Sequence, residues 1–557
     1  MRFCRHFQVG LFVALWSVFA HAQTQPDAGR VLQETRPQPE RAPPVSVPPI
    51  EVPATPRAPA PAASADVRVN VTHFVFTGNS ALSAEVLAAA VTKWSGRALN
   101  FGELIEAVEA VEARYKAAGY FLAQGNLPPQ KIRDGAIEIA ISEGRMGEAR
   151  LEGESRVSSE VFFAYLDRLP KGQALTLAVL ERQVLLINEL AGARAKLDLQ
   201  AGEQSGSTDV VLALQPDEPV SARFDVNNHG SPSTGEKRFS LNLNANSLLN
   251  LGERLTASVL TTDTGNLTSY NVRGELPLGG AGWRFSAGAS RAEYSLGGAF
   301  ASLQASGQAD SIRVGAAYPF IRSRATNLKL LVEADHTTLA DTFRASNTAV
   351  NKKSHGFTVT TSGDWLDAFM GGGANRADLI LRAAQLRLDP TSAAADARPA
   401  GLGTAGSFSK ATLIAQRQQA LGMEFSLQAQ LTWQMAGKNL DSSEKLSLGG
   451  PQTMPGYANG EAVGDSGRLF KLALRWQALP ELALSAFTDY GKLRLADEPL
   501  RTTTKNTKRM TDWGVAADWL IGKGFNASAI LAWAGKETAN PADNDKPRFW
   551  LSAGYAW

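Results

Sequence analysis

Residues Met423–Gln434 read MEFSLQAQLTWQ, in which every second residue is apolar and every other one is polar. Successive side chains of a β-strand point to opposite faces, so this pattern predicts a strand with one apolar and one polar face. Residues Phe239–Ala245 (FSLNLNA) repeat the alternation, and about sixteen candidate strands follow residue 220. The larger part of the chain is therefore predicted to be a β structure.

The connections between the candidate strands alternate between short and long. The short ones read SLLN, PLGG and ALPE, and the long ones cover residues 299–307, 338–354, 390–407, 435–467 and 492–509. Short turns on one side, long loops on the other and an even strand count are typical of a transmembrane β-barrel. A soluble β-sandwich would leave this difference between the two sides unexplained.

A barrel also satisfies the backbone in hydrocarbon, where only a helix or a closed sheet leaves no amide unpaired. No segment offers about eighteen uninterrupted apolar residues for a helical span. The fold class is predicted to be mainly β, with a 16-stranded transmembrane antiparallel β-barrel over residues 217–557. The end of the chain, FWLSAGYAW, would place these side chains toward lipid: Phe549, Leu551, Ala553, Tyr555 and Trp557.

The start of the chain predicts export. Arg2 and Arg5 precede an apolar run that leads to Ala20-His21-Ala22, which indicates a signal peptide over residues 1–22. The only cysteine, Cys4, lies in this segment, so no disulfide or thiolate metal site is expected in the mature chain. With 56 basic and 54 acidic residues, the charge balance gives no support to nucleic-acid binding.

Three segments precede the candidate strands. Residues 23–66 are rich in proline and alanine and are predicted to form a linker, in which Asp27–Glu34 (DAGRVLQE) could make a short helix. Residues 67–145 read strand, helix, helix, strand, strand, and residues 146–216 repeat this order. Two small α+β domains in tandem are therefore expected.

Motifs in the first of these domains resemble the POTRA domains of two-partner secretion transporters. They are Phe74–Asn79 (FVFTGN), Arg114–Tyr120 (RYKAAGY), Leu127–Gln130 (LPPQ) and Ile139–Gly144 (IAISEG). The chain is similar over residues 67–557 to the haemolysin secretion and filamentous-haemagglutinin transporters. The resemblance implies two POTRA domains in the periplasm, a barrel in the outer membrane and an N-terminal helix that plugs the pore.

The stretch Gly449–Gly467 (GGPQTMPGYANGEAVGDSG) lies between the eleventh and twelfth predicted strands. The resemblance implies a loop folded back into the barrel, with a Gly-Gly-Pro, a Val-Arg-Gly-Tyr or close variant, and a Gly-Asp-x-Gly. Pro455 stands where the family pattern has arginine. The matching residues are Gly449, Gly450, Pro451, Met454, Pro455, Gly456, Tyr457, Gly464, Asp465 and Gly467.

The partner motif of the family, Phe-x-Asp-x-Gly, is present as Phe487, Asp489 and Gly491, and the alternation of the strand turns these residues toward the lumen. In relatives the aspartate is thought to pair with the loop arginine, so Asp489 needs another cation here. The candidates are Arg468, Lys471 and Arg475. Other inward residues of mixed sign, which suit a hydrated lumen, are Lys329, Glu333 and Asp335.

Two motifs resemble those of enzymes, but the partner residues or flanking elements that the chemistry requires are missing from the sequence. Gly464–Gly467 (GDSG) resembles a protease nucleophile, but the four histidines of the mature chain form no recognisable constellation with it. Gly401–Gly406 (GLGTAG) precedes a strand rather than a helix, which excludes a dinucleotide loop. No catalytic residue, metal or cofactor is expected, and the chain is predicted not to be an enzyme.

The resemblance implies an outer-membrane translocase that captures an unfolded exoprotein, encoded nearby, and conducts it to the cell surface. Strand addition to an exposed sheet edge is the expected mode of capture. Outer-membrane lipid is the other expected partner, and the chain is expected to be monomeric. A barrel-assembly insertase and a porin-like channel are the alternatives, although a passive pore has no use for periplasmic docking domains.

Overall fold

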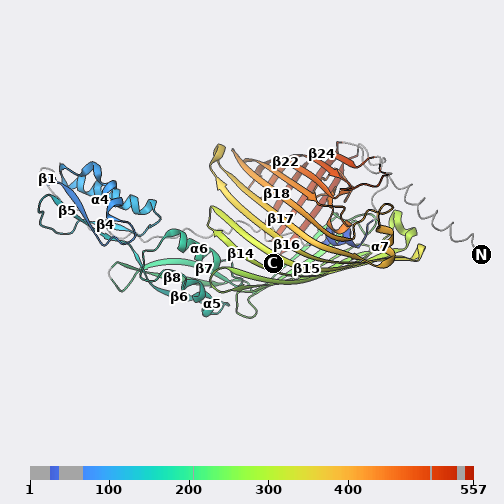
Figure 1. Cartoon of the computed structure of the whole chain (residues 1–557), viewed down its shortest axis with the longest axis horizontal. Coiled ribbons are helices and arrows are strands. Elements are labelled where there is room, and N and C mark those ends of the chain that lie inside the picture. Colours follow the sequence, from blue (N-terminus) through green and yellow to red (C-terminus); the bar gives the residue numbers. More distant parts are fainter. Residues whose placement is uncertain are drawn as a thin grey trace, which may run out of the picture.

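The computed structural model describes residues 26–36, 67–204, 206–501, 503, 505–522, 524–535 and 546–557. The predicted signal peptide, residues 1–22, lies outside the described residues, as does linker segment 37–66. Two small α+β units lie at one end of a tall barrel, and the unit that comes first in the chain lies farther from it (Figure 1).

The described residues form a closed antiparallel barrel of 16 strands, which confirms the predicted fold class. The barrel closes where the last strand pairs with the first, from Ser552↔Asn227 to Ala556↔Arg223. Among the described residues, no helix is both long and apolar enough to cross a membrane. The barrel strands are β9 (Val220–Asn227), β10 (Arg238–Asn246), β11 (Arg254–Thr262), β12 (Leu267–Leu278), β13 (Trp283–Ser295), β14 (Ala305–Arg322), β15 (Thr326–Phe343), β16 (Thr348–Asp367), β17 (Gly373–Leu388), β18 (Gly406–Gly422), β19 (Phe425–Ala436), β22 (Ser466–Leu479), β23 (Leu482–Arg494), β24 (Thr507–Gly522), β25 (Phe525–Ala534) and β26 (Arg548–Ala556).

Side-chain alternation sorts the residues of each strand between the lumen and the outer surface. In β19, Trp433 and Met435 are exposed on the outside, whereas Gln434 is buried. All five of the predicted lipid-facing residues at the C-terminus are exposed, which confirms the predicted orientation of this strand for Phe549, Leu551, Ala553, Tyr555 and Trp557.

The structure corrects two strand boundaries. Met423 and Glu424 have φ of +46° and +66°, so they form the turn before β19 rather than the start of the strand. Residues 338–354 were expected to be a long loop, but β15 continues to Phe343 and β16 begins at Thr348. The ladder continues because backbone pairing, as in Thr338↔Lys353, needs no apolar side chain once a strand has left the membrane.

The first α+β unit contains a three-stranded sheet in the order β2-β5-β4 and a separate two-stranded sheet of β1 and β3. Helix α4 begins with a capping box between Asn100 and Glu103, and its buried face packs Leu104, Val108 and Val111 into the core. Its elements are β1 (Val69–Val71), β2 (His73–Thr77), α3 (Ala84–Ala90), β3 (Arg97–Leu99), α4 (Phe101–Ala117), β4 (Gln124–Asn126) and β5 (Ala136–Ser142).

The second unit follows the same plan, with the sheet order β6-β8-β7. Its first strand is parallel to its last, as β2 is to β5 in the first unit. Leu180, Val184 and Ile187 on one face of α6 are buried in its own core. Its elements are β6 (Arg145–Gly153), α5 (Ser159–Leu166), α6 (Leu177–Ile187), β7 (Ala193–Ala201) and β8 (Ser207–Pro216).

The second unit is attached to the short-turn end of the barrel. Glu189 accepts hydrogen bonds from Arg284 at 3.0 Å and from Arg322 at 2.5 Å. Arg182 of α6 donates to the carbonyl of Pro319 at 2.7 Å. A Cβ added to Gly280, in the turn between β12 and β13, would lie 1.7 Å from the carbonyl oxygen of Ala164. Close backbone approach therefore accompanies the charged contacts and orients the unit.

Candidate functional site

The connection between β19 and β22 folds back into the barrel. It carries a short hairpin of β20 (Leu446–Leu448) and β21 (Ala462–Gly464). Met454 and Tyr457, between these strands, are fully buried. The loop packs against the inner wall in an apolar cluster that consists of Leu448, Met454, Tyr457, Ala462, Leu469, Leu493 and Met510.

Two glycines allow the loop and the wall to come this close. A Cβ added to Gly456 of the loop would lie 2.7 Å from the Trp533 backbone on β25. A Cβ added to Gly491 of the wall would lie 2.6 Å from the Leu448 side chain and 2.8 Å from Met454 Sδ. The glycine of the Phe-x-Asp-x-Gly motif thus leaves space for the loop.

The loop tip at Pro455 is held by hydrogen bonds that need no arginine. The Pro455 carbonyl accepts from Trp550 Nε1 at 2.8 Å. The Gly456 N–H donates to Asp512 Oδ2 at 2.8 Å, and the Tyr457 hydroxyl donates to the carbonyl of Thr511 at 3.0 Å. The tip is therefore fastened to β24 and β26.

Asp512 was not among the residues predicted from the sequence. It faces Asp489 across the β23–β24 pairing, and both side chains are buried. A signal was present, because Asp512-Trp513-Gly514 repeats the Asp-aromatic-Gly order of Asp489-Tyr490-Gly491 on the neighbouring strand. The second glycine also has a use, since a Cβ at Gly514 would lie 2.6 Å from the ring of Phe487.

Lys471 lies between the loop and this carboxylate pair. Its Nζ is 3.4 Å from Asp489 Oδ2 and donates to the carbonyl of Thr453 at 2.6 Å. The Asp489 oxygens accept no well-aligned hydrogen bond from the described residues, so the contact with Lys471 is electrostatic rather than directional. A single lysine thus contacts both the loop backbone and one of two buried carboxylates.

The other two candidate cations are placed differently. Arg475 pairs with Asp518 at 2.7 Å. Arg468 lies on the outward face of β22, as does the exposed Phe470, because strand alternation separates it from Lys471. Within the described part of the chain, neither arginine contacts Asp489. Of the three candidate cations, Lys471 is therefore the one that lies beside Asp489.

Asp465 of the GDSG segment is buried and bonds to residues of separate segments. Its carboxylate accepts from the N–H groups of Leu440 at 3.1 Å and Asp497 at 2.8 Å, and it pairs with Lys445. The hydroxyl of Ser466 accepts from the N–H of Ala436 at 3.0 Å. These contacts connect the loop to the barrel rim. Among the described residues, no group of three or more His, Cys, Asp or Glu side chains is placed to hold a metal ion.

Helix α2 (Ala28–Thr35) lies inside the barrel, where its blue ribbon is visible in Figure 1. It begins after Asp27, whose side chain accepts from the Arg30 N–H at 2.9 Å. The N–H of Ala28 donates to Asp341 of β15 at 2.8 Å, and Arg30 donates to the carbonyl of Asn459 in the loop at 2.7 Å. Its apolar face, with Val31 and Leu32, is buried against inward residues of β12 to β15. The helix therefore contacts both the wall and the loop.

The inward residues named from the sequence belong to a network of mixed charge. Glu333 pairs with Arg273 at 3.3 Å, and Asp335 accepts two hydrogen bonds from Arg382 at 2.5 and 3.0 Å. Lys329 occupies an inward position on the same strand, opposite Pro319. The lumen is thus polar.

A closed barrel with a loop folded into its lumen, preceded by two small α+β units, defines the POTRA and β-barrel class of outer-membrane proteins. The family of haemolysin secretion/activation proteins ShlB/FhaC/HecB matches residues 206–517, and the ShlB-type POTRA domain matches residues 69–144. The chain belongs to the ShlB/FhaC/HecB family. It is a two-partner secretion transporter of the outer membrane, with its POTRA units in the periplasm.

Individual relatives extend this comparison. The heme/hemopexin transporter protein HuxB of Haemophilus influenzae (strain 86-028NP) is 26% identical over 567 residues, which cover 97% of this chain and 96% of HuxB. CdiB from Escherichia coli has a similar structure, with a TM-score of 0.70 and 19% identity over 91% of this chain and 93% of CdiB. BamA from Haemophilus ducreyi lacking POTRA domains 1–3 has a TM-score of 0.51 and 13% identity over 88% of this chain and 100% of that chain. The family match does not favour the insertase alternative.

Proposed function

We propose that the transporter captures an unfolded exoprotein at its POTRA units and conducts it through the barrel lumen to the cell surface. The observation that supports this most is the position of two small α+β units in tandem beyond the short-turn end of a barrel, the second of which is attached to it. Within the described residues, β2 and β4 are the edges of one sheet, and β6 and β7 are the edges of the other. An extended peptide can add to such an edge through main-chain hydrogen bonds.

The proposed division of the chain follows from this function. Residues 1–22 are the signal peptide, 23–66 the plug helix with its linker, 67–145 and 146–216 the two POTRA domains, and 217–557 the barrel. The transported partner is a secreted exoprotein encoded nearby, and outer-membrane lipid surrounds a monomeric barrel. The chain works by binding and conduction, without a catalytic step.

We also infer that the Lys471, Asp489 and Asp512 cluster keeps the loop inside the barrel. Lys471 and Asp512 each bond to the loop backbone, at 2.6 and 2.8 Å. Asp489 compensates the charge of Lys471, which is costly to leave alone in a narrow lumen. Asp489→Asn should therefore reduce export more than Pro455→Ala, and Pro455→Arg should be tolerated if the salt bridge to Asp489 that the resemblance implies can still form. Equal export by Asp489→Asn and the parent protein would contradict this role.

The capture step can be tested with a fragment of residues 67–215, since each POTRA unit has a buried core of its own. We expect the fragment to bind the N-terminal part of the unfolded cognate exoprotein in pull-down and calorimetry. The folded exoprotein is the control and should not bind. If the fragment instead binds unfolded barrel proteins and ignores the exoprotein, an insertase function replaces the present proposal.

A further inference from the structure

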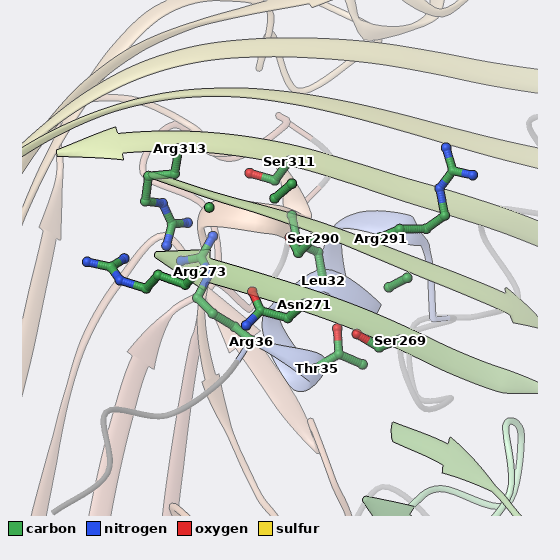
Figure 2. A pocket seen from close by; sticks show the side chains of 13 residues that line it. Leu32, Thr35, Arg36, Ser269, Asn271, Arg273, Ser290, Arg291, Ser311 and Arg313 are labelled. Carbon is green, nitrogen blue, oxygen red and sulfur yellow. The ribbon is translucent and has the colours of Figure 1, made fainter. Parts of the chain in front are cut away.

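A small cavity lies between the C-terminal end of α2 and the inner wall formed by β12, β13 and β14. Its volume is about 40 Å³, which is enough for a few water molecules or one small ion. Figure 2 shows that Arg36 and Arg313 point toward one another here, whereas Arg291 points away. The polar groups that also line it are those of Thr35, Ser269, Asn271, Ser290 and Ser311.

The arginines of this cavity differ in how their charges are compensated. Arg273 pairs with Glu275 at 3.2 Å and with Glu333 at 3.3 Å. Asp335 lies opposite Arg313 in the strand register, but its two oxygens accept from Arg382.

Arg36 and Arg313 have no carboxylate within ion-pair distance among the described residues, and neither donates a hydrogen bond there. Two guanidinium groups that lack an ion-pair partner of their own among the described residues therefore face one cavity, one from the helix and one from the wall. Like charges repel in this arrangement, and an anion between them would remove the repulsion.

We propose that this cavity is a binding site for a small oxyanion of the phosphate class, which bridges Arg36 of α2 to Arg313 of β14. A guanidinium presents two parallel N–H groups that match the oxygens of such an anion, and the hydroxyl and amide groups of the cavity supply further donors. The volume suits a free ion better than a segment of polypeptide. A bridging anion would fasten helix α2 to the barrel wall and so hold it in the lumen. The effect of the anion on pore opening rests on the proposed role of α2 as the plug.

The site can be tested by calorimetry on the purified full-length protein in detergent. Inorganic phosphate is titrated into the protein at constant ionic strength, and a titration with chloride is the reference. We expect saturable binding by the parent protein and a loss of affinity of roughly tenfold or more in Arg36→Gln and in Arg313→Gln, since each removes a charge-assisted contact. Arg291→Gln is the matched control and should bind as the parent does, because Arg291 points away and pairs with Asp310 at 2.7 Å.

Arg36→Gln remains informative even if Arg313→Gln fails to fold, because Arg36 is no part of the barrel wall. Absence of saturable phosphate binding, or an equal loss of affinity in Arg291→Gln, would overturn the site. Unchanged affinity in Arg36→Gln would overturn the bridge. Calorimetry involves no exoprotein, so failure of the anion site and failure of the transport proposal would be seen in different experiments.

Discussion

At the residue scale, Pro455 shows how the tip of the folded-back loop is held without a side-chain ion pair. The side chain of proline offers neither a donor nor a charge. The tip is held instead through backbone groups, since the carbonyl of Pro455 accepts from Trp550 and the N–H of Gly456 donates to Asp512. The anchoring of the tip is therefore made by main-chain hydrogen bonds.

Asp512→Ala is expected to loosen the loop, because it leaves the buried N–H of Gly456 unpaired at a cost of roughly 1–3 kcal/mol. A thiol crosslink between cysteines at positions 454 and 510, which lie on the loop and on the wall in the same buried apolar cluster, would report on docking, and the chain has no other cysteine after Cys4. We expect a lower crosslinking yield in Asp512→Ala. Asp518→Ala on the same strand, where the carboxylate pairs with Arg475, should leave the yield unchanged. An undiminished yield in Asp512→Ala would contradict the anchoring.

In the first POTRA unit, Glu143 accepts hydrogen bonds from the N–H groups of Ser80 and Ala81, both at 2.7 Å, and from the Tyr115 hydroxyl at 2.8 Å. Burial by itself raises the pKa of Glu143, but the hydrogen bonds from Ser80 and Ala81 outweigh it and lower the pKa below its usual value. Burial, and next the bond to Glu143, raise the pKa of Tyr115, which therefore stays a donor.

A lowered folded-state pKa means that Glu143 contributes stability above its unfolded pKa, and that this stability is lost as the pH falls through the folded pKa. Denaturant unfolding of the 67–215 fragment should show this loss below about pH 4.5. Glu143→Gln should lower the unfolding free energy at pH 7 by roughly 1–3 kcal/mol and reduce its pH dependence. Glu138→Gln, at an exposed bond to Thr77, is the control and should change little.

At the scale of elements, α2 differs from the barrel strands because it lies in the lumen without belonging to the wall. Its contacts with Asp341 and Asn459 join it to β15 and to the loop, while residues 37–66 connect it to the first POTRA unit. A short helix on a proline-rich tether can leave the lumen without breaking any strand pairing.

Deletion of residues 23–50 should therefore raise the single-channel conductance in planar bilayers while secretion persists. A variant that deletes residues 51–60, from the linker alone, retains the helix and should conduct as the parent does. Unchanged conductance after deletion of the helix would exclude its function as a plug.

At the scale of the whole molecule, the second POTRA unit is coupled to the barrel through charged contacts and through main-chain hydrogen bonds, from the N–H of Ser158 to the carbonyl of Asn250 and from the N–H of Ala191 to the carbonyl of Gly252. Glu189 is bonded to two arginines of the wall, and Arg182 of α6 caps the carbonyl of Pro319. These contacts lie beside the turns that close β12 to β13 and β14 to β15. Their strength sets how firmly the capture units are oriented toward the lumen.

Glu189→Ala should weaken this docking by about 1–3 kcal/mol, because two guanidinium groups lose their acceptor. Hydrogen exchange in the turns 279–282 and 323–325 should become about fivefold faster for each kcal/mol lost. Secretion should fall while the 67–215 fragment with the same substitution still binds the exoprotein. Glu203→Ala, at an exposed turn of the same unit, is the control, and equal exchange rates in both variants would show that Glu189 does not orient the unit.

The sequence by itself determined the class of this protein. A period of two in the strands, as in Phe425–Ala436, follows from the geometry of the single strand, so the barrel and the orientation of Trp433 and Gln434 could be predicted without knowledge of any neighbour. The Gly-rich loop motif and the POTRA motifs are likewise contiguous in the chain, which is why their places could be found by inspection.

Only the tertiary structure decided which groups meet inside the lumen. Asp512 bonds to Gly456 across 56 positions, and Lys471 rather than Arg468 or Arg475 faces Asp489. The length of β15 beyond its apolar part was also decided by pairing with β16. The physical reason is the same in each case: strand register and loop docking are set by contacts between distant segments, whereas side-chain alternation is set within one strand.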